Sequence, residues 1–142
     1  MSSSKNKRIV AIDFGLKRCG IAITDEANII ASGLTTVASK ELMTFLKQLV
    51  TEKNIGTIVL GEPKRLNNED THSSQNVRFL REALEQNFPD IEIVMVDERF
   101  TSKMAVQSLV TGGVTKKKRA NKELIDEVSA TIILQSFMDM KH

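Results

Sequence analysis

The amino-terminal part of the chain carries short apolar runs separated by small polar turns. Residues 8–14 (RIVAIDF) are apolar and β-prone, and this run ends at Gly15. Residues 19–25 (CGIAITD) and 28–37 (NIIASGLTTV) are two further runs of the same kind. Three consecutive strands joined by short loops predict an antiparallel meander.

Beyond residue 38 the apolar residues recur at helical spacing, and these helices alternate with short strands. Ser39 is predicted to be the N-cap of the first helix, in which Leu42, Leu46 and Leu49 share a face. The predicted elements are, in order, a helix over 40–53, a strand over 57–61, a helix that ends near 87, a strand over 91–97, a helix from about 101 that stops at Gly112-Gly113, and a helix over 121–139.

The resulting order, βββαβαβαα, predicts an α/β fold in a single domain over residues 1–142. The meander supplies antiparallel strands and the alternation of strands and helices supplies parallel ones, so we expect a five-stranded mixed sheet flanked by helices. This is the order of the ribonuclease-H-like topology. Because a fold does not specify a function, the function must be sought in particular residues.

The composition fits an ordinary globular domain and excludes several kinds of site. The chain has one cysteine, Cys19, which we expect in the core, and two histidines, so neither an internal disulfide nor a structural zinc site is expected. Phe45, Phe79, Phe88 and Phe137 also occupy apolar positions and are predicted to be core. No targeting peptide and no apolar run of about 18 residues is recognised, which predicts a cytoplasmic protein without a membrane partner.

Asp13 is the first residue that suggests chemistry. It stands inside the apolar run IVAIDF, and strand alternation places it on one face with Ile9 and Ala11. A carboxylate in apolar surroundings must be paired or bind a cation. The alternative is an Asp that only helps to form the turn at Gly15.

Two more acids follow the fifth predicted strand, in the triplet Asp97-Glu98-Arg99. Neighbouring strand residues point to opposite faces, so at most one of these acids shares the face of Asp13. The alternative is a solvated strand end with an Asp–Arg ion pair.

Asp126 opens the last predicted helix. It shares a stripe with Ala130, Ile133 and Phe137, and this apolar stripe predicts that the helix packs inward with Asp126 on the packed face. The alternative is a structural Asp that favours the positive end of the helix.

Asp13, Glu98 and Asp126 together predict a catalytic, metal-binding cluster, since converging carboxylates repel one another unless cations neutralise them. Oxygen ligands without His or Cys favour Mg²⁺ or Mn²⁺, and two such ions about 3.5–4 Å apart can promote phosphodiester hydrolysis. Glu62 and Asp97 are candidates for an additional ligand. Glu62 alternates onto one face with Ile58 and Leu60, and its alternative is a turn residue before Pro63.

Four segments of the chain together resemble a bacterial family whose members are named pre-16S ribosomal-RNA nucleases or Holliday junction resolvases. The segments are AIDFGLKRCGIAITD, GEPKRLNNEDTHSS, VDERFTS and KELIDEVSATIILQ, and the resemblance covers nearly the whole chain. It implies a ribonuclease-H-like fold and a divalent-metal-dependent hydrolase in which Asp13, Glu98 and Asp126 bind the metal. Many members have an apolar residue where this chain has Glu62, which leaves the second ligand open.

The resemblance implies one of two activities. One is maturation of the 5′ end of 16S ribosomal RNA, with ribosomal particles as partners, and we expect this role for such a small, single-domain family. The other is cleavage of four-way DNA junctions in recombination or repair, which needs two active sites. The sequence leaves the choice between RNA and DNA, and the oligomeric state, open.

Basic residues follow several of the predicted strand ends, although the net charge is only +2. They are predicted to position the phosphate backbone of a nucleic acid, with ordinary solvated charge as the alternative. The residues are Lys17, Arg18, Lys64, Arg65 and Arg99, together with the run Lys116, Lys117, Lys118 and Arg119.

Two other function classes are considered. A sugar-kinase or actin-like ATPase also opens with an Asp-x-Gly turn, here Asp13-Phe14-Gly15, but it needs two copies of the fold, and this chain has room for one. A non-catalytic nucleic-acid-binding module on the same scaffold is the second alternative, and the presence of both Asp13 and Asp126 argues against it.

Overall fold

The computed structural model describes residues 7–15, 17–62, 72–97 and 122–140, and at 62, 72–74, 97, 122–126 and 140 it describes the backbone alone. The elements are β1 (Arg8–Phe14), β2 (Arg18–Thr24), β3 (Ala31–Ala38), the 3₁₀ turn η2 (Ser39–Glu41), α1 (Leu42–Glu52), β4 (Ile55–Glu62), α2 (His72–Asn87), β5 (Glu92–Asp97) and α5 (Lys122–Met140). The helix predicted from about residue 101 lies outside the described residues.

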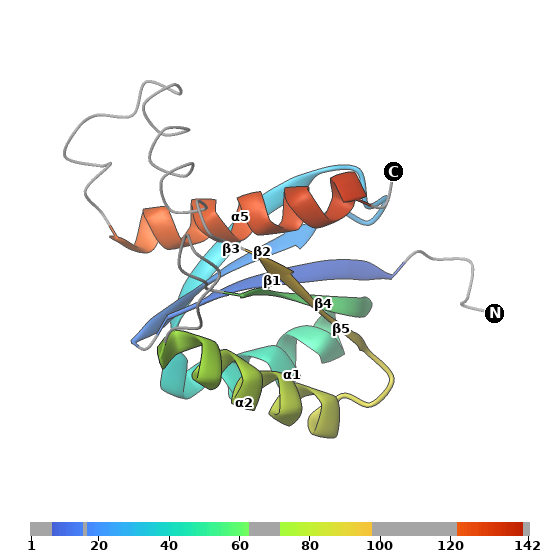
Figure 1. Cartoon of the computed structure of the whole chain (residues 1–142). Coiled ribbons are helices and arrows are strands. Elements are labelled where there is room, and N and C mark those ends of the chain that lie inside the picture. Colours follow the sequence, from blue (N-terminus) through green and yellow to red (C-terminus); the bar gives the residue numbers. More distant parts are fainter. Residues whose placement is uncertain (1–6, 16, 63–71, 98–121, 141–142) are drawn as a thin grey trace.

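The five strands form one mixed sheet in the order β3-β2-β1-β4-β5 (Figure 1). β1, β2 and β3 pair antiparallel, whereas β1, β4 and β5 pair parallel. The predicted meander and the predicted five-stranded mixed sheet are therefore confirmed, and the architecture is ribonuclease-H-like. β1 lies at the centre, where the antiparallel and the parallel halves of the sheet meet.

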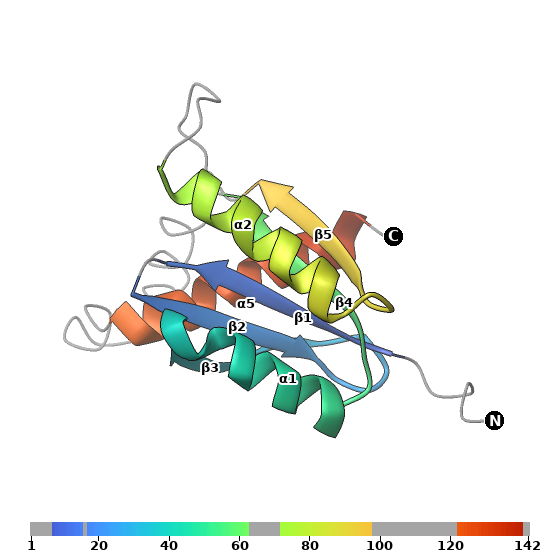
Figure 2. The same cartoon turned by 90° about the horizontal axis from the view of Figure 1, so that it is seen from below.

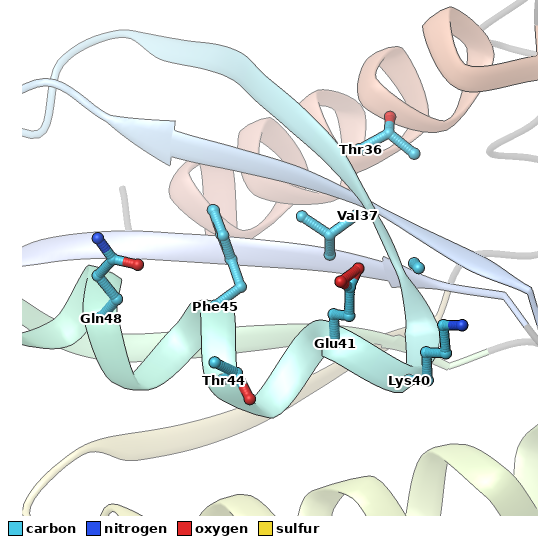
Figure 3. Close-up of a pocket in the computed structure, with 8 residues that line it drawn as sticks. Thr36, Val37, Lys40, Glu41, Thr44, Phe45 and Gln48 are labelled. Carbon is cyan, nitrogen blue, oxygen red and sulfur yellow. The ribbon is translucent and has the colours of Figure 1, made fainter.

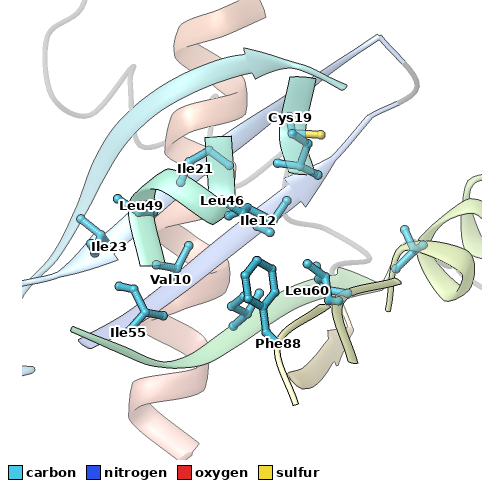
Figure 4. Packing of buried hydrophobic residues seen from close by; sticks show 14 residues of the cluster. Val10, Ile12, Cys19, Ile21, Ile23, Leu46, Leu49, Ile55, Leu60 and Phe88 are labelled. Atoms are coloured by element: carbon cyan, nitrogen blue, oxygen red, sulfur yellow. The ribbon is translucent and has the colours of Figure 1, made fainter. Parts of the chain in front are cut away.

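Helices cover both faces of the sheet, and strand alternation divides the core between them. Val10 and Ile12 of β1 belong to the cluster under α1 and α2, as do Ile58 and Leu60 of β4 (Figures 2 and 4). The intervening residues form the second cluster, beneath α5, which contains Ala11 of β1. The inner strands β1, β2 and β4 are thus buried on both sides, which explains their nearly continuous apolar sequences.

Among the elements that the structure describes, α5 is the one helix that crosses this face of the sheet (Figure 1). Ala130, Ile133 and Phe137 of the predicted stripe are all buried in the α5 cluster, so the prediction that this helix packs inward is confirmed. Among the helices that the structure describes, none combines the length and the apolar character needed to span a membrane.

The third strand begins later than predicted, at Ala31 rather than residue 28. Asn28 has a left-handed backbone with φ of 57°, and the Asp25 side chain accepts amide hydrogen bonds from Ile29 (2.7 Å) and Ile30 (2.9 Å). These amides, with that of Ile30 contributing most, lower the pKa of the exposed Asp25 carboxyl below its usual value. A polar turn therefore holds two apolar residues that the hydrophobic pattern assigned to a strand.

The prediction that Phe79 is core is wrong. Its side chain is 64% exposed on α2, whereas Val77 and Leu84 of the same helix are fully buried. Position 79 lies two residues after Val77, which is off the helical stripe that faces the sheet. Cys19, Phe88 and Phe137 are buried as predicted, and Phe45 is partly buried against the same core as Cys19.

Candidate functional site

Three acids stand at the carboxyl ends of three adjacent parallel strands. Asp13 is the penultimate residue of β1, Glu62 ends β4, and Asp97 ends β5. Glu62 and Asp97 are register partners in the β4–β5 pair. In open α/β sheets this edge is where ligands bind, since the parallel strands all end there.

Asp13 lies on the face of the sheet that α5 covers. Its strand neighbours Ile9 and Ala11 pack in the α5 cluster, and Asp13 follows them in the alternation. The carboxylate is half-buried, so it stands at the margin of the packed layer rather than in open solvent. The predicted common face is therefore confirmed for Ile9 and Ala11, and the regular strand continues through Asp13.

A row of register partners connects Asp13 to α5. Asp13 pairs with Gly20 of β2, and Gly20 pairs with Thr36 of β3. The Thr36 hydroxyl donates to Glu127 Oε2 at 3.4 Å, and Figure 3 shows Thr36 on the α5 side of β3 and Val37 on the other side. Glu127 directly follows Asp126 in the sequence. The start of α5 therefore lies above the row of the sheet that contains Asp13.

The β1–β2 turn lies directly after Asp13. A Cβ atom on Gly15 would stand 2.6 Å from the Arg18 carbonyl oxygen, so the turn closes too tightly for any larger residue. Lys17 is exposed, whereas Arg18 is half-buried and pairs with Ala38 of β3. The turn therefore presents one exposed cation and, at the start of β2, one half-buried cation.

Much of the predicted site lies beyond the part of the chain that the structure describes. Glu98, Lys64, Arg65, Arg99, Lys116, Lys117, Lys118 and Arg119 fall outside it, and Glu62, Asp97 and Asp126 are described by their backbone alone. Among the described side chains no group of three or more His, Cys, Asp or Glu is arranged to hold a metal. Among the predicted metal ligands, Asp13 is the only residue whose side chain the structure describes.

Ser129 is a polar residue that the sequence analysis missed. It lies three residues after Asp126 on α5, its side chain is 1% exposed, and its Oγ has no hydrogen-bond partner among the described residues. Burying a hydroxyl without a partner costs free energy. Nothing in the helical pattern distinguishes this Ser from an ordinary small residue at a packed position.

An open groove of about 510 Å³ lies on the other side of the edge strand, between the end of β3 and α1 (Figure 3). Its lining includes one acid, Glu41, and one base, Lys40. A single carboxylate does not provide the ligand set for a hard divalent cation. The groove is therefore a poor candidate for the chemistry, and the carboxyl edge of the sheet is the better one.

Comparison with known proteins identifies the family of the chain. A family model described as "RuvX: Holliday junction resolvase" matches residues 7–140. A relative from Flavobacterium psychrophilum, named "Putative pre-16S rRNA nuclease", is 50% identical over 134 residues, which is 94% of this chain and 98% of the relative. A relative of the same name from Amoebophilus asiaticus is 50% identical over 131 residues, which is 92% of this chain and 93% of the relative.

Solved structures support the fold. The fowlpox virus resolvase in complex with Holliday junction DNA superposes with a TM-score of 0.59 at 13% identity, over 94% of this chain and 98% of that one. T. thermophilus RuvC in complex with a Holliday junction substrate gives a TM-score of 0.56 at 11% identity, over 96% of both chains. At such low identities the likeness concerns the fold alone. The match to the family model and the 50% identity to its curated relatives, both over almost the whole chain, establish that the chain belongs to the RuvX family of nucleases.

Proposed function

We propose that the chain is a divalent-metal-dependent endonuclease that hydrolyses phosphodiester bonds and processes the 5′ end of pre-16S ribosomal RNA. The observation that carries the proposal is the row from Asp13 through Gly20 to Thr36, because Thr36 bonds to the residue after Asp126. Asp13 and Asp126 are 113 positions apart in the sequence (126 − 13), and this row assigns both of them to one end of the sheet. Such convergence is what a metal-binding carboxylate cluster requires.

Strand alternation favours Glu98 over Glu62 and Asp97 as the second acid. Val94 and Val96 of β5 pack in the α5 cluster, so a continued alternation assigns Glu98 to the face of Asp13. Ile58 and Leu60 pack on the opposite face, and the same rule groups Glu62 with them. The proposal therefore assigns Asp13, Glu98 and Asp126 as metal-binding and catalytic residues, and leaves Glu62 and Asp97 as additional candidates at the edge.

The donor set fits a hard cation. Carboxylate oxygens without imidazole or thiolate favour Mg²⁺ or Mn²⁺. When bound, such ions activate a water and stabilise the leaving oxygen of a phosphodiester. The chain contributes the orientation of the carboxylates: Asp13 is carried by the central strand, and Asp126 by a helix that is packed across the sheet.

The basic residues serve to hold the substrate backbone. Lys17 is exposed in the turn after Asp13, and Lys64 and Arg65 follow Glu62 in the sequence. Arg99 follows Glu98, and the run Lys116–Arg119 precedes α5 by a few residues. We assign all of them to contacts with phosphates, which position a nucleic acid without reading its sequence.

A ribosomal-RNA substrate is favoured over a DNA junction by the names of the curated relatives, which are about half identical to this chain. Such a substrate implies a cytoplasmic protein that meets ribosomal particles. The description of the family model as a Holliday junction resolvase keeps junction cleavage as the second candidate, and that activity requires a dimer with two sites.

Side-by-side cleavage of a precursor 16S 5′-end RNA and a four-way DNA junction tests the proposal. The wild-type protein and Asp13→Asn are compared with Mg²⁺ or Mn²⁺, and with the metal chelated. We expect metal-dependent cleavage of the RNA by the wild type and none by Asp13→Asn. Acid-dependent cleavage of the junction alone, by a stable dimer, would replace the proposal with a resolvase, and cleavage of neither would favour a non-catalytic binding module.

A further inference from the structure

Ser39 stands where the chain leaves β3 for α1, and its hydroxyl does not cap the helix. No side-chain capping bond is present at the start of η2 or of α1, so the predicted N-cap is wrong. The Ser39 hydroxyl instead donates to the carbonyl oxygen of Gly15 at 2.6 Å. The contact reaches across 24 positions to the turn that directly follows Asp13.

Two further contacts tie Ser39 to the same turn. Its backbone N–H donates to the Lys17 carbonyl oxygen at 2.9 Å, and its Oγ lies 3.4 Å from the Sγ of Cys19. A carbonyl oxygen can only accept, so the single hydroxyl proton is committed to Gly15 and the Cys19 thiol is the donor toward Ser39. Ser39 thus contacts Gly15 and Lys17 of the turn and Cys19 of β2.

Ser39 leads directly into an element that is packed in the core. It begins η2, which leads into α1, and Leu42, Leu46 and Leu49 bury α1 against the sheet. Cys19 is fully buried in the same cluster, and Figure 4 shows it beside the α1 residues of that core. A hydrogen bond from a packed element holds its partner more firmly than one from a free loop.

Gly15 has no room for a side chain. A Cβ on Gly15 would meet the Arg18 carbonyl oxygen at 2.6 Å, so the two strands approach closely at this point. Asp13 stands two residues before Gly15 and opposite Gly20. A displacement of Gly15 is therefore transmitted along the backbone to the end of β1.

We infer that Ser39 is a positioning residue for the nuclease site: its hydroxyl fixes the β1–β2 turn so that Asp13 keeps its place relative to α5. This inference rests on the proposed function, because it assigns Asp13 to the metal. Ser39 acts through Gly15 and touches neither the metal nor the substrate. Partners that orient metal ligands commonly change metal affinity or activity by about 10–100-fold when they are removed.

Ser39→Ala, Ser39→Thr and the control Thr51→Ala test the inference. Thr51→Ala is the matched control, because Thr51 Oγ1 also donates to a backbone carbonyl, that of Lys47 at 2.9 Å, but on the exposed side of α1. Amide hydrogen exchange of Phe14, Gly15 and Cys19 is measured on metal-free protein, followed by Mn²⁺ affinity and by kcat and KM for RNA cleavage.

We expect Ser39→Ala to speed amide exchange in the turn about five- to tenfold, the loss typical of one hydrogen bond. Mn²⁺ affinity and kcat should each fall about tenfold or more, while KM for RNA changes by less than about threefold. Ser39→Thr keeps the hydroxyl and should restore all of these values, and Thr51→Ala should match the wild type. If Ser39→Ala does not fold, Ser39→Cys replaces it, since a thiol donates only weakly. The variant is kept reduced, because the new thiol would lie beside that of Cys19.

The inference would be overturned if Ser39→Ala kept the amide exchange rates and the Mn²⁺ affinity of the wild type. It would also be overturned if Thr51→Ala lost as much Mn²⁺ affinity and kcat as Ser39→Ala, because the loss would then reflect a general decrease in stability. A wild-type protein that neither binds Mn²⁺ nor cleaves nucleic acid would instead overturn the proposed function. In that case the metal-free exchange rates still decide whether Ser39 holds the turn.

Discussion

Gly33 of β3 and Thr131 of α5 lie so close together that a Cβ atom on Gly33 would stand 3.3 Å from the Thr131 hydroxyl oxygen. The same Cβ would be 3.4 Å from Cβ of Glu127. The edge strand can therefore approach the helix because residue 33 has no side chain. This close approach brings Thr36 within reach of Glu127, and so holds the start of α5 over the row that contains Asp13.

Gly33→Val is expected to destabilise the protein by about 1–3 kcal/mol, the usual cost of overpacking, since the branched side chain would force β3 away from α5. Urea unfolding measures this change. The control is Ser32→Val. Ser32 is exposed like Gly33, but strand alternation directs its side chain away from α5, so a β-branched residue suits the strand there and should be neutral or slightly stabilising. Equal stability of Gly33→Val and the wild type would mean that the strand and the helix are not closely packed.

Most of the fold follows from local patterns. Apolar runs with turns between them predicted all five strands, and β1 begins and ends at the predicted residues. The pattern failed where apolar residues occupy a turn. Ile29 is 71% exposed although it looks like part of a strand, because Asp25 and the left-handed Asn28 specify a turn that hydrophobicity does not reveal.

The sequence predicts acids for the candidate site, but it does not predict the contacts around Asp13. Strand alternation assigned the face of Asp13, and helical periodicity assigned the packed face of α5, because both depend only on neighbours along the chain. Ser39 was assigned to a helix cap because a hydroxyl before a helix usually is one. Its actual partner, the Gly15 carbonyl, becomes a neighbour only after β1, β2 and β3 have paired.

Ser129→Ala is expected to be neutral or to stabilise the protein by up to about 1 kcal/mol, since it removes a buried hydroxyl without a partner among the described residues. We nonetheless expect RNA cleavage to fall about tenfold. Residues that destabilise the fold are commonly retained because the active site needs them, and Ser129 lies one turn after Asp126. Thermal unfolding and RNA cleavage are compared with Ser136→Ala, a half-buried Ser farther along α5. Full activity in Ser129→Ala would show that the hydroxyl is incidental to the reaction.

Neutralising Lys116, Lys117, Lys118 and Arg119 together should weaken RNA binding and flatten its dependence on salt. Each phosphate contact to a single strand contributes about 0.7 to the slope of log K against log salt, so four contacts predict a change of up to about 3. The slope is measured by titration at several salt concentrations. Lys47 and Lys53, which are exposed on and just after α1, supply the control, since that helix covers the face opposite α5. An unchanged slope in the fourfold variant would remove the run from the substrate contacts.

Asp13→Asn and Asp126→Asn should each reduce cleavage by more than about 100-fold, beyond the usual effect of losing an outer-shell partner, because each removes a proposed metal ligand. The two variants should still fold, and without metal they should be as stable as the wild type or more so, since one charge of a repelling cluster is gone. Mg²⁺ or Mn²⁺ should raise the unfolding temperature of the wild type but not of either variant, because only a bound ligand stabilises the folded state.

The control is Asp139→Asn, an exposed acid near the other end of α5 whose Oδ1 accepts a hydrogen bond from Gln135 at 2.9 Å. It should cleave RNA and respond to metal as the wild type does. A metal-induced shift that survives in Asp13→Asn would place the ion elsewhere in the protein and would contradict the assignment of the site.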